Sequence, residues 1–349
     1  MSEKINTTEI LIKEIIGRYA PDVEVLTITA LTPDASARRY YTAELTAHPK
    51  YPRSLVCMVF DGVNSPEASG AGAVRSDQAY VELSTFFLNH GINVPELYFD
   101  ARQDGVLLIE NFGSTLLFHE LSDSAKSVEH KEKLLFASID QIFKIQSITP
   151  DDTFFAFQRS FSGEIYKKEM QEFWDYYFTW AHLLEDAKRD FHYSVEWISN
   201  ELLKMPPVLS HRDFHAWNLM VLPQQYIGVI DFQDALMATA YYDIVSLLND
   251  RDMDSLLGRD LYYKALNYFF SLVKQSMPKR DYLIVLLQRD LKVAGRFAKL
   301  EFVMKKLGYA KWIPGTVRRI ISTIDELSTL TEVPKELVKL RQRIREYSA

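Results

Sequence analysis

Two histidines, an arginine, an aspartate and an asparagine stand among apolar residues in the segment LSHRDFHAWNLM, residues 209–220. Polar groups of this kind are costly to bury unless they are paired or used. Asp213 ends a His-Arg-Asp triplet and Asn218 follows after four further residues, the H-R-D-x-x-x-x-N spacing typical of phosphoryl-transfer loops. Thirteen residues after Asn218, the apolar run in GVIDFQD ends in Asp231.

Phosphoryl transfer to a hydroxyl group explains why these residue types occur together. One carboxylate must lie beside the attacking hydroxyl, and hard oxygen ligands must hold Mg²⁺ on the phosphates. We therefore predict that Asp213 is the base, which accepts the proton late because the transition state is largely dissociative. Asn218 and Asp231 are the predicted magnesium ligands.

Three neighbouring residues have a functional and a structural interpretation. His215 could contact a substrate or could hydrogen-bond to the backbone of its own loop. Trp217 is interpreted as core packing, with a platform for sugar stacking as the alternative. Asp243, at the start of the apolar helix in YYDIVSLL, could cap that helix or could hydrogen-bond back to the catalytic loop.

The bulk composition limits the class of protein. Of 349 residues, 47% are hydrophobic, which predicts a sizeable core, and the net charge of -7 argues against general nucleic-acid binding. The single cysteine, Cys57, lies in an apolar run and is predicted to be a buried, inert thiol. The N-terminal residues lack a signal-peptide core, and no run approaches the roughly 18 apolar residues that span a bilayer, so we expect a cytoplasmic protein without membrane segments.

The elements that position the motif fall into two parts. Period-two and apolar patterns predict strands in the first third, and residues 54–60 are apolar enough for a central strand. An amphipathic helix is predicted at the N-terminus, a second one at 76–89, and long helices over most of the chain beyond residue 114. Residues 208–234 form a compact insert with two short strands around the motif loop. The predicted architecture is an N-terminal nucleotide-binding lobe, residues 1–112, and a helical C-terminal lobe, residues 113–349.

These segments resemble the aminoglycoside phosphotransferase and choline kinase superfamily, and within it the bacterial anomeric N-acetylmuramate and N-acetylglucosamine kinases of cell-wall recycling. The resemblance covers nearly the whole chain. It is carried by five segments: DASARRYY (34–41), VLLIENFG (106–113), HRDFHAWNLM (211–220), GVIDFQDA (228–235) and LQRDLKVAGRFAKL (287–300). It implies an α+β, protein-kinase-like fold with a small N-terminal β-sheet lobe and a larger helical lobe.

The resemblance also implies ATP and Mg²⁺ as cofactors and a set of binding residues. The turn that contains Ser36, Arg38 and Arg39 would cover the ATP phosphates, and the hinge backbone at Glu110 would meet adenine. The third strand lacks the lysine that protein kinases place against the phosphates. The positive charge that this lysine would supply must therefore come from another residue, with Arg38, Arg39 and Arg75 as candidates. A solvated basic edge is the alternative for Arg38 and Arg39.

The sequence thus predicts an ATP- and Mg²⁺-dependent kinase for a small-molecule alcohol, and the resemblance favours the anomeric hydroxyl of an amino sugar. A first alternative is a kinase for choline or an aminoglycoside. The acidic stretch NDRDMDS, residues 249–255, could line a cation site for such an acceptor, or could be a solvated surface. A second alternative is a nucleotide-binding pseudokinase, supported by the missing lysine alone.

Overall fold

The computed structural model describes residues 2–31, 38–60, 74–178, 187–273 and 278–347. Its contacts divide the chain into two compact units. The first comprises Met1–Leu117 with Asn218–Asp234, and the second comprises Phe118–Trp217 with Ala235–Ala349. The segment that follows the motif loop therefore packs with the N-terminal unit, and the lobe boundary between residues 112 and 113 stays a prediction.

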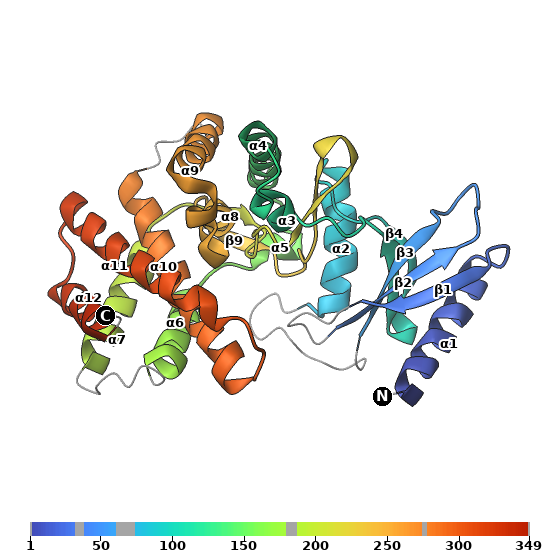
Figure 1. Ribbon diagram of the computed structural model, residues 1–349, viewed down its shortest axis with the longest axis horizontal. Helices are drawn as coiled ribbons and strands as arrows, with labels where there is room; N and C mark the ends of the chain where they lie inside the picture. Colours follow the sequence, from blue (N-terminus) through green and yellow to red (C-terminus); the bar gives the residue numbers. More distant parts are fainter. Residues whose placement is uncertain (1, 32–37, 61–73, 179–186, 274–277, 348–349) are drawn as a thin grey trace. The chain divides into compact units, whose positions relative to one another are not determined.

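The first unit is built on an antiparallel sheet with the order β1-β2-β3-β5-β4 (Figure 1). Its strands are β1 (Val25–Ala30), β2 (Arg39–Leu45), β3 (Ser54–Val59), β4 (Leu97–Ala101) and β5 (Val106–Glu110). The apolar run predicted to be central is β3, which pairs with β2 on one side and β5 on the other. A strand buried on both faces needs apolar side chains in both directions, which explains the run.

Two helices complete the first unit. From α1 (Ser2–Tyr19), Ile12, Ile15 and Ile16 are fully buried in a core with sheet residues such as Leu108, so the predicted amphipathic helix is confirmed. Ile10 of the same helix is half exposed, so it lies off the buried face. The second helix, α2 (Ser76–Asn89), has the predicted bounds.

Strands β7 (Leu219–Val221) and β8 (Ile227–Val229) form a hairpin. Backbone hydrogen bonds join this hairpin to the N-terminal part of the first unit. Val221 N–H donates to Thr115 O at 2.8 Å, and Val229 N–H donates to Asn93 O at 2.7 Å. A Cβ atom at Gly228 would lie 2.5 Å from the ring of Phe112, so a larger residue there would require that ring to move away from the hairpin.

The second unit is mostly helical. Its helices are α3 (Leu117–Ser122, beginning at the unit boundary), α4 (Val128–Gln146), α5 (Phe155–Gln158), α6 (Gly163–Glu172), α7 (Ala187–Leu202), α8 (Tyr242–Asn249), α9 (Met253–Leu272), α10 (Lys279–Ala298), α11 (Ile313–Leu330) and α12 (Lys335–Tyr347). Most residues of α10 are buried, which marks it as the central helix. The strands flanking the motif loop do not pair with each other, since β6 (Pro207–Ser210) pairs with β9 (Leu236–Thr239).

Across the residues that the structure describes, no helix combines the length and apolar character needed to cross a bilayer.

Cys57 lies in the middle of β3 and is fully buried, as predicted. Burial raises the pKa of its thiol to about 12. Because the thiolate is the reactive form, we expect a thiol reagent at neutral pH to label native protein roughly a thousandfold more slowly than unfolded protein. Stopped-flow labelling with and without denaturant checks this, and fast labelling of the native protein would contradict the buried position.

Candidate active site

The motif loop, residues 211–218, is anchored by Asp243 from α8. Ser210 Oγ donates a hydrogen bond to Asp243 Oδ1 at 2.8 Å. The backbone N–H groups of His211 and Arg212 donate to Oδ2 and Oδ1 at 2.8 and 3.0 Å. Of the two interpretations of Asp243, the bond back to the catalytic loop is confirmed. The capping role is wrong, because Asp243 lies inside α8, after the cap residue Tyr241.

These bonds hold a backbone conformation that a non-glycine residue rarely adopts. Arg212 has φ 79°, in the left-handed region that disfavours residues with a Cβ atom. Strain of this kind persists where surrounding contacts over-determine the conformation, as the carboxylate of Asp243 does here. The strained turn directly precedes Asp213.

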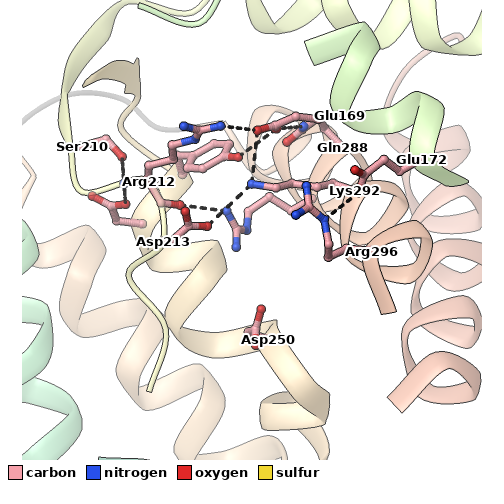
Figure 2. A network of polar contacts seen from close by, with 12 residues as sticks. Glu169, Glu172, Ser210, Arg212, Asp213, Asp250, Gln288, Lys292 and Arg296 are labelled. Atoms are coloured by element: carbon pink, nitrogen blue, oxygen red, sulfur yellow. Dashed lines mark hydrogen bonds and ion pairs between the residues drawn. The ribbon is translucent and has the colours of Figure 1, made fainter. Parts of the chain in front are cut away.

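Asp213 lies among cationic side chains of the second unit (Figure 2). Lys292 Nζ of α10 is 3.6 Å from Asp213 Oδ1, and the side chain of Asp213 remains 35% exposed. Burial disfavours the ionised carboxyl, but Lys292, Arg212 and Arg289 outweigh that effect and hold the pKa of Asp213 well below its usual range. Asp213 is therefore an ionised carboxylate at physiological pH, and its side chain is partly accessible to solvent.

Glu169 of α6 is the centre of the polar network in Figure 2. Its carboxylate accepts from Arg212 Nη2 at 3.0 Å and Gln288 Nε2 at 3.1 Å, and it lies 3.3 Å from Lys292 Nζ. Burial opposes its ionisation, while Lys292 and Arg212 lower the pKa of Glu169 below its usual value. Arg289 Nη1 in turn donates to the carbonyl oxygen of Arg212 at 3.0 Å. Helix α10 therefore contacts the motif loop directly, through Arg289 and Lys292.

His215 and Trp217 occupy the same loop with different surroundings. Burial lowers the pKa of His215, so its imidazole is neutral, and its Nδ1 has no hydrogen-bond partner in the described part of the chain. The ring of Trp217 stacks on Phe118 at 4.4 Å between centroids, and the guanidinium of Arg251 lies 5.4 Å from its centre. Packing on Phe118 and Arg251 supports the core interpretation of Trp217, while the unpartnered nitrogen of His215 leaves a substrate contact open.

The acidic stretch, residues 249–255, is matched by arginines. Asp250 pairs with Arg251 at 2.5 Å, and Asp254 pairs with Arg319 at 2.8 Å. Figure 2 shows Asp250 across from Asp213. The paired side chain of Asp250 is only 9% exposed, which makes it a poor ligand for a cationic acceptor. The Asp254 side chain is 30% exposed, so part of the stretch does face solvent.

The two predicted metal ligands lie at the same end of the β7–β8 hairpin in the first unit. Leu219 pairs with Val229, so Asn218 and Asp231 flank the last pair, and Ile230 N–H donates to Asn218 O at 3.0 Å. Asp231 has φ 63°, and its side chain is 47% exposed.

The donor chemistry at this hairpin end fits magnesium. Mg²⁺ usually binds one or two protein oxygens together with phosphates and water, rather than an all-protein cage. An exposed carboxylate at Asp231 and the side-chain amide of Asn218, at the same end of the hairpin, supply oxygens of the kind that such a set needs. Gln233 Nε2 donates to Asp231 Oδ1 at 2.8 Å, which orients the carboxylate. Asp213 belongs to the other unit, so its convergence with Asn218 and Asp231 on one cation stays a prediction.

The predicted nucleotide-binding residues have different surroundings. Arg38 Nη1 is 3.5 Å from Asp231 Oδ1, which places one of the three candidate arginines beside the metal carboxylate. Arg39 instead donates to Thr8 Oγ1 at 3.1 Å, toward α1. Arg75 Nη2 pairs with Asp77 at 2.6 Å. Among the three, Arg38 is the best placed for the charge that the missing lysine would supply.

Ser36 and Glu110 are the two remaining residues that were predicted to bind the nucleotide. Ser36 lies outside the described residues. Glu110 ends β5, where its N–H donates to Glu96 O at 2.8 Å, so the hinge backbone starts from a fixed strand end. Its contact with adenine stays a prediction.

Sequence reasoning missed Glu169 and Lys292. Lys292 lies inside the segment LQRDLKVAGRFAKL, which contributed to the family resemblance but received no role. Glu169 occurs in a helix rich in charged residues, where nothing in the local pattern distinguishes it from surface glutamates. Only the tertiary contact of α6 with α10 shows that both residues face the loop.

Replacing Asp243 tests the anchor of the loop. Asp243→Ala would remove the acceptor of three donors, of which the Arg212 N–H keeps Ser210 Oγ at 3.1 Å as a second acceptor. We expect a loss of about 3–5 kcal/mol in the free energy of unfolding together with lost activity. Asp243→Asn keeps one oxygen acceptor, so its free energy of unfolding should fall by less than that of Asp243→Ala. Urea unfolding of the three proteins provides the measurement, and wild-type stability of Asp243→Ala would refute the anchoring role.

Relatives of known name cover most of the chain. The phosphotransferase enzyme family matches residues 27–268. The N-acetylmuramate/N-acetylglucosamine kinase of Neisseria meningitidis serogroup B is 27% identical over 324 residues, which span 89% of this chain and 90% of that protein.

Solved structures share the fold. The gentamicin complex of APH(2")-IIa has a TM-score of 0.60 at 16% identity, covering 93% of this chain and 97% of that chain. The choline kinase LicA from Streptococcus pneumoniae has a TM-score of 0.56 at 14% identity, covering 93% and 99%. The predicted kinase-like α+β fold, with a small sheet-bearing part and a larger helical part, is thereby confirmed, as is the superfamily resemblance. Because the family match spans well over half of the 349 residues, the chain belongs to the phosphotransferase enzyme family and is an enzyme that phosphorylates an alcohol group.

Proposed function

We propose that this phosphotransferase uses ATP and Mg²⁺ to phosphorylate an amino sugar, N-acetylmuramate or N-acetylglucosamine, at its anomeric hydroxyl. The observation that carries the proposal is Asp213, an ionised and partly exposed carboxylate on a rigidly anchored loop. The name of the Neisseria relative, which matches along nearly its whole length, supports the choice of sugar.

Asp213 would receive the acceptor hydroxyl and orient it toward the phosphoryl group. A carboxylate with a strongly lowered pKa is a weak base, so it takes the proton only when the oxygen–phosphorus bond is well formed. That timing suits phosphoryl transfer, because the loose transition state places little demand on early deprotonation. Orientation is then the main contribution of Asp213.

Asn218 and Asp231 would hold the metal through an amide oxygen and a carboxylate oxygen. When bound, Mg²⁺ supplies positive charge to the phosphate oxygens. Arg38, which lies beside Asp231, would add a second positive group near the phosphates and so compensate for the lysine that the third strand lacks.

The charge around Asp213 favours a neutral or anionic acceptor. Lys292, Arg212, Arg289 and Arg251 provide four cations near the carboxylates of Asp213, Glu169 and Asp250, so this group carries a net positive charge. A choline or aminoglycoside cation would meet like charges there, which costs several kcal/mol in an interface. N-acetylglucosamine carries no charge, and the lactyl carboxylate of N-acetylmuramate would be attracted.

A panel of acceptors tests the proposed substrate class. With radiolabelled ATP and magnesium, we expect kcat/KM for the two N-acetyl sugars to exceed that for choline or an aminoglycoside roughly 100-fold or more, because of the like charges near Asp213. The 1-deoxy analogue of an active sugar should accept no phosphate. A preferred cationic acceptor would refute the sugar assignment, and an active 1-deoxy analogue would refute the anomeric position.

Asp213→Asn separates an enzyme from a pseudokinase. We expect kcat to fall about 10²–10⁴-fold while the affinity for ATP, measured by calorimetry, stays within about twofold, because only proton acceptance and hydroxyl orientation are lost. Asp231→Ala is the contrasting variant, and it should abolish the magnesium dependence of ATP binding. An Asp213→Asn protein with wild-type turnover would contradict the base assignment.

A further inference from the structure

Two charged pairs connect α6 to α10, one helical turn apart (Figure 2). Glu169 Oε1 is 3.3 Å from Lys292 Nζ. Three residues further along α6 and four further along α10, Glu172 Oε2 is 2.7 Å from Arg296 Nε. Both pairs join the same two helices, so either could serve to hold α6 against α10.

The surroundings of the two pairs differ. Arg296 is 50% exposed, and a solvent-exposed pair of this kind contributes little to stability. Lys292 is only 11% exposed, and its ammonium also reaches Asp213 Oδ1 at 3.6 Å. The pair of Arg296 with Glu172 therefore only connects the two helices. The pair of Lys292 with Glu169 also contacts Asp213, the predicted base.

The position of Lys292 is fixed from several sides. Glu169, its partner, also accepts from Arg212 and Gln288, and Tyr242 Oη lies 3.4 Å from Glu169 Oε2. A Cβ atom at Gly295 would lie 2.3 Å from the backbone carbon of Glu172, so α10 touches the backbone of α6 between the two pairs. This close approach of the two helices lets the Lys292 ammonium reach Glu169 on α6 and Asp213 on the loop at the same time.

We propose that Lys292, held in place by Glu169, is a positioning residue that fixes the orientation of the Asp213 carboxylate for the acceptor hydroxyl. The inference rests on the proposed function, because it requires Asp213 to act on the acceptor. Lys292 would act through Asp213, with its ammonium drawing one carboxylate oxygen toward α10 and leaving the other for the substrate.

Other charged and titratable groups around Asp213 have contacts of a different kind. Arg212 Nη2 donates to Glu169, and Arg289 Nη1 donates to the carbonyl oxygen of Arg212. Both therefore shape the loop backbone and its support, whereas the short ion pair from Lys292 reaches the side chain of Asp213 itself. The charged groups around this carboxylate are Arg212, Glu169, Asp250, Arg289 and Lys292, and the uncharged titratable groups are His215 and Tyr242.

Kinetics of matched variants test the role of Lys292. We expect Lys292→Met to lower kcat about 100-fold, with KM for ATP within about twofold of wild type, because a misplaced proton acceptor affects the transition state more than nucleotide binding. Lys292→Arg keeps a positive charge but replaces the compact ammonium with a planar guanidinium, so its kcat should stay within about tenfold of wild type. Arg296→Met, the control on the same helix, should keep wild-type kcat.

A double mutant separates positioning from a merely structural role. If Lys292 acts through Asp213, Lys292→Met should add less than about a twofold loss in an Asp213→Asn background, whereas independent effects would multiply. Melting temperatures and ATP affinity of all variants show whether each protein is folded. A folded Lys292→Met protein with wild-type kcat, or an undiminished loss in the double mutant, overturns the inference.

The same measurements distinguish failure of this inference from failure of the proposed function. Wild-type protein that phosphorylates no sugar contradicts the proposed acceptor, and the variants are then compared on the hydrolysis of ATP by water. In that assay, loss of turnover in Lys292→Met but not in Arg296→Met supports the positioning role, and equal rates refute it.

Discussion

The ion pairs and hydrogen bonds of the buried Glu169 carboxylate are the interactions on which the position of the motif loop in the second unit depends. A buried charge is tolerated only when partners compensate it, and removing one partner of such a group is strongly destabilising. Here the partners come from the loop, from α10 and from α8, through Arg212, Lys292 and Tyr242. The placement of three elements is therefore coupled to one side chain, and the loop cannot move without leaving charges unpaired.

That coupling requires two helices to approach to backbone contact. Gly295 permits it, since a Cβ atom there would overlap the backbone of Glu172. With any other residue, α10 would shift away from α6, and the ammonium of Lys292 would lose its reach to Glu169 and Asp213 together. The absence of a side chain at Gly295 thus permits the contacts of the Lys292 ammonium with Glu169 and Asp213.

Much of the fold could be predicted because local patterns determine it. The central strand β3 and the helix α2 follow from an apolar run and from a bounded amphipathic pattern. The pairing of β6 could not be predicted, because this strand is short and its partner β9 follows only after the motif loop and the β7–β8 hairpin. The motif residue Asp213 was recognisable from its spacing, whereas Lys292 becomes significant only when α10 is placed in space.

Strained backbone occurs at two motif positions, one in each unit. Arg212 and Asp231 both have positive φ, at 79° and 63°, although neither is glycine. Each is held by a separate scaffold: the carboxylate of Asp243 holds the turn at Arg212, and Phe232, which packs on Tyr80 at 4.7 Å, follows Asp231. Such conformations carry a cost of about 1–3 kcal/mol each and persist only where packing enforces them. Because each unit enforces its own strained residue, the backbone at Arg212 and the backbone at Asp231 are each fixed by contacts within one unit.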